Sequence, residues 1–241
     1  MQVVGPVVIG AFAGGLLQGF AGFGFAMVAV PLTGLFLSPL ETLPYAMVLQ
    51  ALMGIVGLPG AVGACRWRLL GWLSVGAAIG SPLGFWIITL VTPKIGHLLV
   101  GLTVLAASGL IASGLKLHAQ HERAAGVGAG LASGIMNGLA GMSGPPAVAL
   151  LLGTHSEPRQ VRATLLVFVF LAALFALAPF ALLGKLHTGM ILPLLPAGLA
   201  LAGGMAIGST LFNRTTAETH RRVALIALAV LGVVTVIAAV R

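Results

Sequence analysis

Two glycine-rich stretches hold the residues of this chain whose types and spacing suit the binding of an anion. The first reads GGLLQGFAGFGFAMVAVPL over residues 14–32, and the second reads SGIMNGLAGMSGPPAVALLL over residues 133–152. Glycine and proline interrupt an apolar run in both stretches, so each predicts a helix that breaks and starts again. The start of a helix offers free backbone N–H groups and the positive end of the helix dipole, and both favour an anion.

Polar side chains stand beside these glycines and add hydrogen-bond donors. Gln18, Asn137 and Ser143 supply amides and a hydroxyl, while glycine lets an oxyanion approach the backbone because it has no Cβ. We therefore expect a substrate-binding site made of Gln18, Gly22, Phe23, Gly24, Asn137, Gly141, Ser143 and Gly144. The competing interpretation is that glycine and alanine serve only helix packing, as small residues at four-residue spacing do in membranes.

The two stretches coincide when the chain is slid by 119 residues. At this offset several glycines match, the amides Gln18 and Asn137 match, and so do Pro39 and Pro158. A duplicated apolar segment interrupted by glycine and proline is the pattern that indicates the binding site of a secondary transporter. We therefore expect both amides to face one ligand.

A second pair of similar segments supports the duplication. GAAIGSPL from Gly76 and GMAIGSTL from Gly204 align at an offset of 128 residues. The sequence therefore predicts two repeats, residues 1–118 and 119–241, that form a single membrane domain.

Composition predicts the class of protein that holds these stretches. Of 241 residues, 59% are hydrophobic and 7% are charged, against roughly 25% charged in a soluble domain. Apolar runs of about 20 residues can cross a membrane, so we expect an all-α, polytopic helical membrane protein. It has eight apolar segments: 3–36, 42–63, 69–91, 97–115, 124–153, 161–183, 188–212 and 223–240. The net charge of +8 comes from basic residues scattered between these segments, which argues against nucleic-acid binding.

The first apolar segment of each half is too long for one crossing. Residues 3–36 would form a helix of about 50 Å, so we expect this segment and residues 124–153 to be broken or re-entrant. If both are re-entrant, nine Lys and Arg residues lie on one face of the membrane and three on the other. This bias predicts inverted halves with both ends of the chain outside the cytoplasm. Continuous, kinked crossings are the alternative.

The motifs resemble those of a known family. Gly-Phe-Ala-Gly-Phe-Gly at 19–24, followed by Pro31, and the run Asn-Gly-Leu-Ala-Gly-Met-Ser-Gly-Pro-Pro from Asn137 are typical of the sulfite exporter TauE/SafE family, also described as sulfonate and sulfur-compound permeases. The resemblance covers essentially the whole chain. It implies movement of sulfite or an organosulfonate across the cell's inner (cytoplasmic) membrane, often outward. The anion, the direction and a coupling proton or cation stay open, and a homodimer is compatible with such a small transporter.

Other classes of function are weighed against this one. Gly141 to Gly144 resembles the GxSG of rhomboid proteases, but a nucleophilic Ser143 needs a base, and every histidine lies near a charged connection rather than in the middle of an apolar segment. A membrane scaffold without transport is the other alternative. Cys65 is the single cysteine and the histidines lack metal-ligand spacing, so we expect no metal, no cofactor and no enzyme. Arg159 and Arg162 can guard an entrance or serve as topology anchors.

Overall fold

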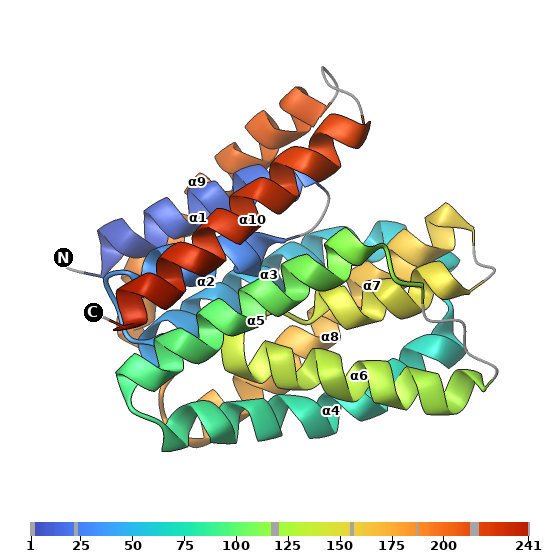
Figure 1. The fold of residues 1–241 in the computed structure, drawn as a ribbon, viewed down its shortest axis with the longest axis horizontal. Coiled ribbons are helices and arrows are strands. Elements are labelled where there is room, and N and C mark those ends of the chain that lie inside the picture. The colour runs from blue at the N-terminus through green and yellow to red at the C-terminus, as the bar shows by residue number, and fades with distance from the viewer. Residues whose placement is uncertain are drawn as a thin grey trace.

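The computed structural model describes residues 3–21, 24–116, 121–154, 157–186, 188–212 and 217–240, which form helices and no strands (Figure 1). The α-helices are α1 Val4–Ala21, α2 Phe25–Gly34, α3 Pro39–Ala61, α4 Trp67–Leu90, α5 Pro93–Ser113, α6 Glu122–Ala140, α7 Gly144–Gly153, α8 Pro158–Leu182, α9 Ile191–Phe212 and α10 Ala217–Val240. Two short 3₁₀ helices, η1 Val62–Ala64 and η2 Thr188–Met190, follow α3 and precede α9. The predicted all-α class is confirmed.

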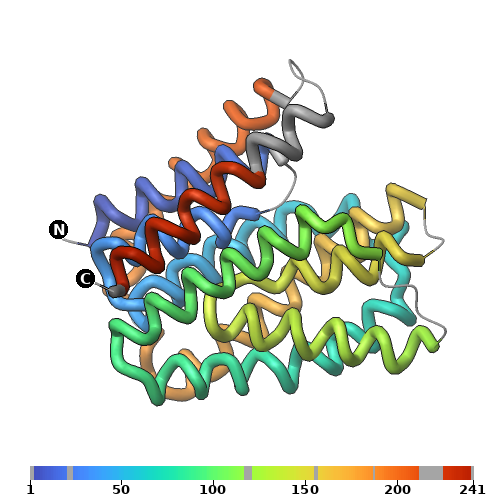
Figure 2. The backbone as a smooth tube through the Cα atoms, in the orientation of Figure 1, coloured from blue at the N-terminus to red at the C-terminus, as the bar shows by residue number. Residues whose placement is uncertain are grey.

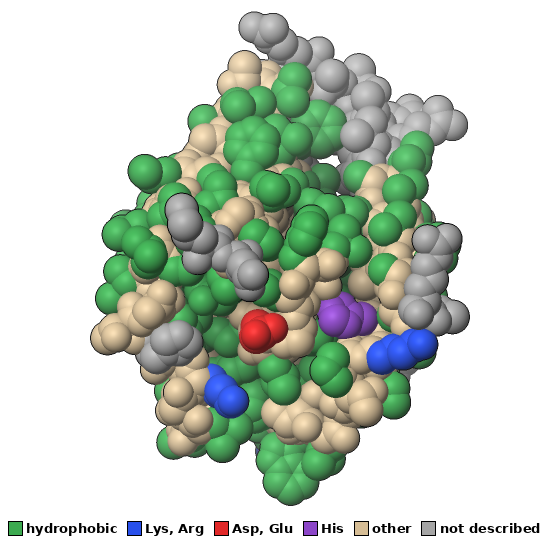
Figure 3. Space-filling view, turned by 90° about the vertical axis from the view of Figure 1, so that its left-hand side faces the viewer, with side chains coloured by type: hydrophobic (Ala, Val, Ile, Leu, Met, Phe, Trp, Pro, Cys, Tyr) green, Lys and Arg blue, Asp and Glu red, His purple; other side chains and the backbone are tan. Residues whose placement is uncertain are grey.

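The outer surface of the helices suits lipid. Among the described residues, five helical stretches are long and apolar enough to cross a membrane: Pro39–Ala64, Trp67–Leu90, Pro93–Ser113, Pro158–Leu182 and Thr188–Leu211. Large apolar side chains such as Val56 and Leu199 are 83% and 78% exposed. The end-on view of Figure 3 shows apolar side chains over most of that face. Because a soluble protein rarely exposes so much apolar surface, the chain is a multi-pass membrane protein.

The first apolar segment is a helical hairpin rather than one long helix. α1 ends at Ala21, and α2 starts at Phe25 after Gly24, whose φ of 98° lies in the left-handed region that glycine tolerates. The hydroxyl of Thr33 in α2 donates to the carbonyl of Pro6 in α1 at 3.3 Å, so α2 runs back along α1. With a length of about 15 Å, α2 covers half of a hydrocarbon core of about 30 Å.

The fifth apolar segment is broken in a similar way. α6 ends at Ala140, and Gly141, with a φ of 73°, donates its N–H to the carbonyl of Asn137 at 2.7 Å. A left-handed glycine is a common end of a helix because it satisfies the last carbonyls. α7 then starts at Gly144 and returns beside α6 (Figure 2). The chain thus turns back at both glycine-rich stretches.

Helix boundaries recur at the offset of the sequence motif. α2 and α7 each contain 10 residues, and they start at Phe25 and Gly144, which are 119 positions apart. α3 and α8 start at Pro39 and Pro158 with the same separation. Proline suits the first helical position because its N–H would have no partner there. In Figure 2, α1 runs from the left-hand end towards the right and α6 runs the opposite way.

Glycines join the hairpins to helices from the other half of the chain. α4 with α6 and α1 with α9 are the most extensively packed helix pairs in the described part. A Cβ built on Gly130 of α6 would overlap the carbonyl of Leu73 in α4, and one on Gly208 of α9 would overlap the carbonyl of Leu16 in α1. The helices of both pairs therefore touch backbone to backbone, as small residues allow in membranes.

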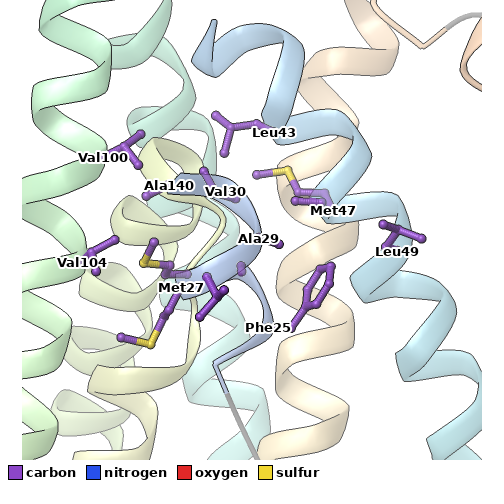
Figure 4. Packing of buried hydrophobic residues seen from close by; sticks show 14 of the residues in the cluster. Phe25, Met27, Ala29, Val30, Leu43, Met47, Leu49, Val100, Val104 and Ala140 are labelled. Carbon is purple, nitrogen blue, oxygen red and sulfur yellow. The ribbon is translucent and has the colours of Figure 1, made fainter. Parts of the chain in front are cut away.

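α2 lies in the centre of the fold. Eight of its ten residues are buried. Figure 4 shows its side chains packed among Leu43 and Met47 of α3, Val100 and Val104 of α5, and Ala140 at the end of α6. A half-length helix can end at membrane depth only where protein covers its free backbone groups, and α2 meets that condition.

Basic side chains gather at one end of the molecule. The ends of α3, α5 and α7 and the starts of α4, α6 and α8 lie at the right-hand end of Figure 1, and this end carries Arg66, Arg68, Lys116, Arg123, Arg159 and Arg162. At the opposite end, which Figure 3 faces, the described basic residues are Lys94 and Lys185. The start of α1 and the end of α10 lie at this second end (Figure 1).

Candidate functional site

A cavity of about 1080 Å³ lies where the tips of the two hairpins face α3, α5, α8, α9 and α10. Gln18 and the range 24–27 line it from the first hairpin, and the range 141–145 lines it from the second. Lys116 at the end of α5 and Arg162 near the start of α8 line it as well, and both are exposed. The cavity therefore extends from the hairpin tips towards the basic end of the molecule.

The start of α2 offers backbone donors to this cavity. The N–H of Phe25 is already bound, since it donates to Oε1 of Gln18 at 3.2 Å. The N–H groups of Ala26 and Met27 belong to the same first turn, which has no partners within the helix. Gln18 therefore acts as a cap that fixes the start of α2, and its half-buried side chain lines the cavity at the same time.

The start of α7 differs, because Pro145 and Pro146 fill its first turn and have no N–H. The donors that remain are the N–H of Gly144 and the hydroxyl of Ser143. Ser143 is 1% exposed, and its hydroxyl has no hydrogen-bond partner in the described part of the chain. The second tip thus presents one buried hydroxyl to the cavity, in place of the row of N–H groups that a helix start usually supplies.

Asn137 lies away from the cavity. It is fully buried, and its Nδ2 donates to the carbonyl of Ala172 in α8 at 2.7 Å. Its Oδ1 has no partner among the described residues. Asn137 therefore ties α6 to α8, whereas the amide at the equivalent place in the first half, Gln18, faces the cavity.

The structure brings together most of the residues expected at the site. Around one cavity lie Gln18, Gly24, Gly141, Ser143, Gly144 and Arg162. Asn137 is not among the described lining residues, and neither is Arg159, whose side chain is exposed. Gly22 and Phe23 fall outside the described residues.

Sequence reasoning missed several residues that line the cavity. Gln50 of α3 is 5% exposed and lines it, and an amide within the apolar run 42–63 is a signal that could have found it. Lys116, three residues after the end of α5, lines the cavity as well. Four methionines also line the cavity: Met27, Met53, Met142 and Met205. Methionine is flexible and fills irregular space, so these side chains can adapt to a bound molecule.

The one cysteine lies outside the cavity, at the connection between α3 and α4. Burial raises the pKa of the Cys65 thiol, while a hydrogen bond to Thr164 acts in the opposite direction. Beside it, the N–H of Arg66 donates to the hydroxyl of Thr164 at 2.9 Å, and the guanidinium of Arg66 pairs with Glu122 at 2.9 Å. These contacts join the basic ends of α4, α6 and α8 and have a structural role.

Comparison with known proteins assigns the family. A family model described as "Sulfite exporter TauE/SafE" matches residues 7–235 of the 241-residue chain. The chain belongs to this family. The match agrees with the resemblance carried by the two glycine-rich stretches, and TauE/SafE proteins are membrane transporters of sulfur compounds. No curated protein and no solved structure matches the chain.

Proposed function

We propose that this TauE/SafE-family protein is a secondary transporter of the cell's inner membrane. It exports a small sulfur-containing anion, such as sulfite or an organosulfonate, and binds it between the hairpin tips. One observation carries the proposal: the starts of α2 and α7, both buried in protein, line the same cavity as Arg162. Positive helix ends and a cationic side chain attract an anion. The described lining residues include no Asp or Glu that would oppose it.

The parts of the cavity have different roles in this proposal. The N–H groups of Ala26 and Met27 and the hydroxyl of Ser143 donate to the oxygen atoms of the anion at the inner end. Gln18 and Gln50 flank that end with amides. Arg162 and Lys116, both exposed, raise the local concentration of anions at the opening, an effect that falls as ionic strength rises.

We also propose that the two halves are inverted repeats, residues 1–118 and 119–241. The matched starts of α2 with α7 and of α3 with α8 support this, as do hairpins that enter from opposite ends of the molecule (Figure 2). Inverted repeats that place broken helices around one site are typical of secondary transporters. The basic end then faces the cytoplasm, because cytoplasmic loops are rich in Lys and Arg.

Transport by purified protein in liposomes tests the function. Counterflow of sulfite, thiosulfate, methanesulfonate and acetate is measured for the parent protein and two glycine variants. Gly141→Val places a β-branched residue at a φ of 73° at the cavity, so uptake should fall by about tenfold or more while the protein stays folded. Gly128→Val in the preceding helix α6 is the control, since a Cβ at Gly128 meets nothing within 4 Å.

Two results would contradict the proposal. A folded parent protein that moves none of the three sulfur anions is not the proposed exporter. Normal uptake by Gly141→Val would place the binding site away from the second hairpin tip.

A further inference from the structure

Equivalent helix pairs of the two halves differ in how they pack. The pair α1–α9 lines the cavity through Gln18, Met205 and Ser209. The equivalent pair α6–α4 is closed against α8, where Asn137 bonds the carbonyl of Ala172. Figure 1 shows α1 and α9 leaning away together from the helices below them at the right-hand end, whereas α4, α6 and α8 stay together.

The same polar positions are therefore open in one half and closed in the other. Ser209 of α9 is exposed and lines the cavity, while its counterpart Ser81, 128 positions earlier in α4, is 0% exposed. Gln18 is half-buried at the cavity, while its counterpart Asn137, 119 positions later, is 0% exposed. One polar surface occurs twice, and one copy of it is hidden.

The hidden copy is poorly satisfied where it lies. The buried hydroxyls of Thr103, Ser108 and Thr235 bond to the preceding turn, as Ser108 does to the carbonyl of Val104 at 2.7 Å. Six buried side-chain polar atoms have no partner in the described part, and four of them lie on α4 and α6: the hydroxyls of Ser74, Ser81 and Ser133 and Oδ1 of Asn137. Buried polar atoms without partners are uncommon, and a surface that meets water in another state accounts for them.

We infer that Ser81 and Asn137 form a second, closed half of the transport path. This inference rests on the proposed inverted repeats. In the opposite state α4 and α6 part from α8, these two side chains line a cavity open to the end that carries Lys94 and Lys185, and α1 with α9 closes against α3. Rocking of one repeat against the other around a fixed site produces alternating access.

The two amides then exchange partners. The residue equivalent to Ala172 is Met53 of α3, which lines the cavity, so the amide of Gln18 bonds the carbonyl of Met53 when the first half closes. The residue equivalent to Phe25 is Gly144, which keeps its N–H, so Oδ1 of Asn137 accepts that N–H when the second half opens. In each state one amide is therefore hydrogen-bonded to α3 or α8, and the other is hydrogen-bonded to the start of α2 or α7.

Side-specific labelling of single cysteines tests this inference. In a Cys65→Ser background, Ser209→Cys, Ser81→Cys and Ser108→Cys are treated separately with an impermeant maleimide from either side of vesicles of known orientation. Ser209→Cys should react only from the side of the basic end. Ser81→Cys should react only from the opposite side. Ser108→Cys is the buried control in α5 and should react from neither.

A second variant probes the exchange of the amides. Asn137→Asp keeps the Oδ1 acceptor that the open half uses but replaces the Nδ2 donor to the carbonyl of Ala172 with an oxygen, so it weakens only the closed packing of α6 on α8. It should raise the labelling rate of Ser81→Cys by about fivefold or more and lower that of Ser209→Cys, because the loss of one hydrogen bond shifts the two populations by about that factor. Equal rates with and without Asn137→Asp would show that this bond does not hold the second half closed.

The outcomes separate this inference from the proposed function. If the Ser81→Cys protein transports an anion yet reacts from neither side, or from the same side as Ser209→Cys, the second path is overturned and the exporter function stands. If the parent protein moves no sulfur anion, the exporter function is wrong. The side from which each cysteine reacts still decides whether the two halves of the path open in turn. Should Ser81→Cys not fold, Ala77→Cys on α4 takes its place with the same expectation, because Ala77 is buried and its counterpart Met205 lines the cavity.

Discussion

At the scale of single residues, Gln18 and Asn137 hold the same place in the duplicated motif and have different partners. Oε1 of Gln18 accepts the N–H of Phe25 within its own hairpin, whereas Nδ2 of Asn137 donates to the carbonyl of Ala172 in α8. Both partners are backbone groups, so a residue of almost any type at position 25 or 172 could supply them. The type of residue therefore indicates that an amide is needed at each tip, and the tertiary packing determines what it binds.

The hydroxyl of Ser143 allows a test at this scale that separates binding from stability. It is buried and has no partner in the described part, so it costs free energy in the empty protein. Ser143→Ala should therefore raise the free energy of unfolding by about 1 kcal/mol while it weakens binding of the transported anion. Thermal unfolding and uptake are measured on the same preparations.

Ser108→Ala is the matched control, because its hydroxyl is bonded to the carbonyl of Val104. It should lower stability slightly and leave uptake unchanged. A loss of stability in Ser143→Ala would mean that the hydroxyl already has a partner in the empty protein. Unchanged uptake would remove Ser143 from the binding site.

At the scale of helices, local signals allowed the breaks and restarts to be predicted. Pro39 and Pro158 each start a helix, and glycines at the two tips adopt left-handed backbone, because these residues act on the chain at their own positions. Contacts between distant helices were not predictable in this way. The burial of Asn137 against α8 depends on how α4, α6 and α8 pack, and no residue near Asn137 signals it.

Packing between helices also explains many glycines of the two stretches that were expected to bind the anion. Several glycines of the duplicated stretches, such as Gly134 and Gly138, face the backbone of α4 rather than the cavity. The interpretation as packing residues therefore holds for the glycines along the body of α1 and α6. The interpretation as a binding site is kept for the glycines at the tips, which line the cavity.

Close packing of α4 on α6 predicts a strong effect of a larger residue between them. A Cβ on Gly130 would overlap the carbonyl of Leu73, and backbone on both sides leaves no flexible side chain to move. Gly130→Val should thus destabilise the protein by about 3 kcal/mol or more, seen as a lower yield of monodisperse protein and a lower Tm.

The control for this prediction lies two residues away in the same helix. Gly128 faces open space, so Gly128→Val should keep the yield and Tm of the parent. If Gly130→Val is as stable as the control, α4 and α6 are further apart than the structure has them.

At the scale of the whole molecule, the path of the backbone and the distribution of basic residues favour the same orientation of the protein in the membrane. The hairpins let both the start of α1 and the end of α10 lie at one end, and the described basic residues gather at the other (Figure 1). A chain whose eight apolar segments all crossed continuously would place six of its twelve Lys and Arg residues on each face. The charge distribution and the backbone path thus favour the same proposed placement in the membrane, in which the cavity opens towards the basic end and this end faces the cytoplasm.

This placement predicts which connections can be labelled in intact cells. Lys185 follows α8 and Arg159 begins it, both side chains are exposed, and they lie at opposite ends of the molecule. In a Cys65→Ser background, Lys185→Cys should react with an impermeant maleimide added outside, whereas Arg159→Cys should react only after the membrane is permeabilised. Both variants should transport as well as the parent, because neither residue lines the cavity. If only Arg159→Cys reacts in intact cells, the protein has the opposite orientation in the membrane. The cavity would then open to the outside, and outward transport from this state would begin from the closed half of the path.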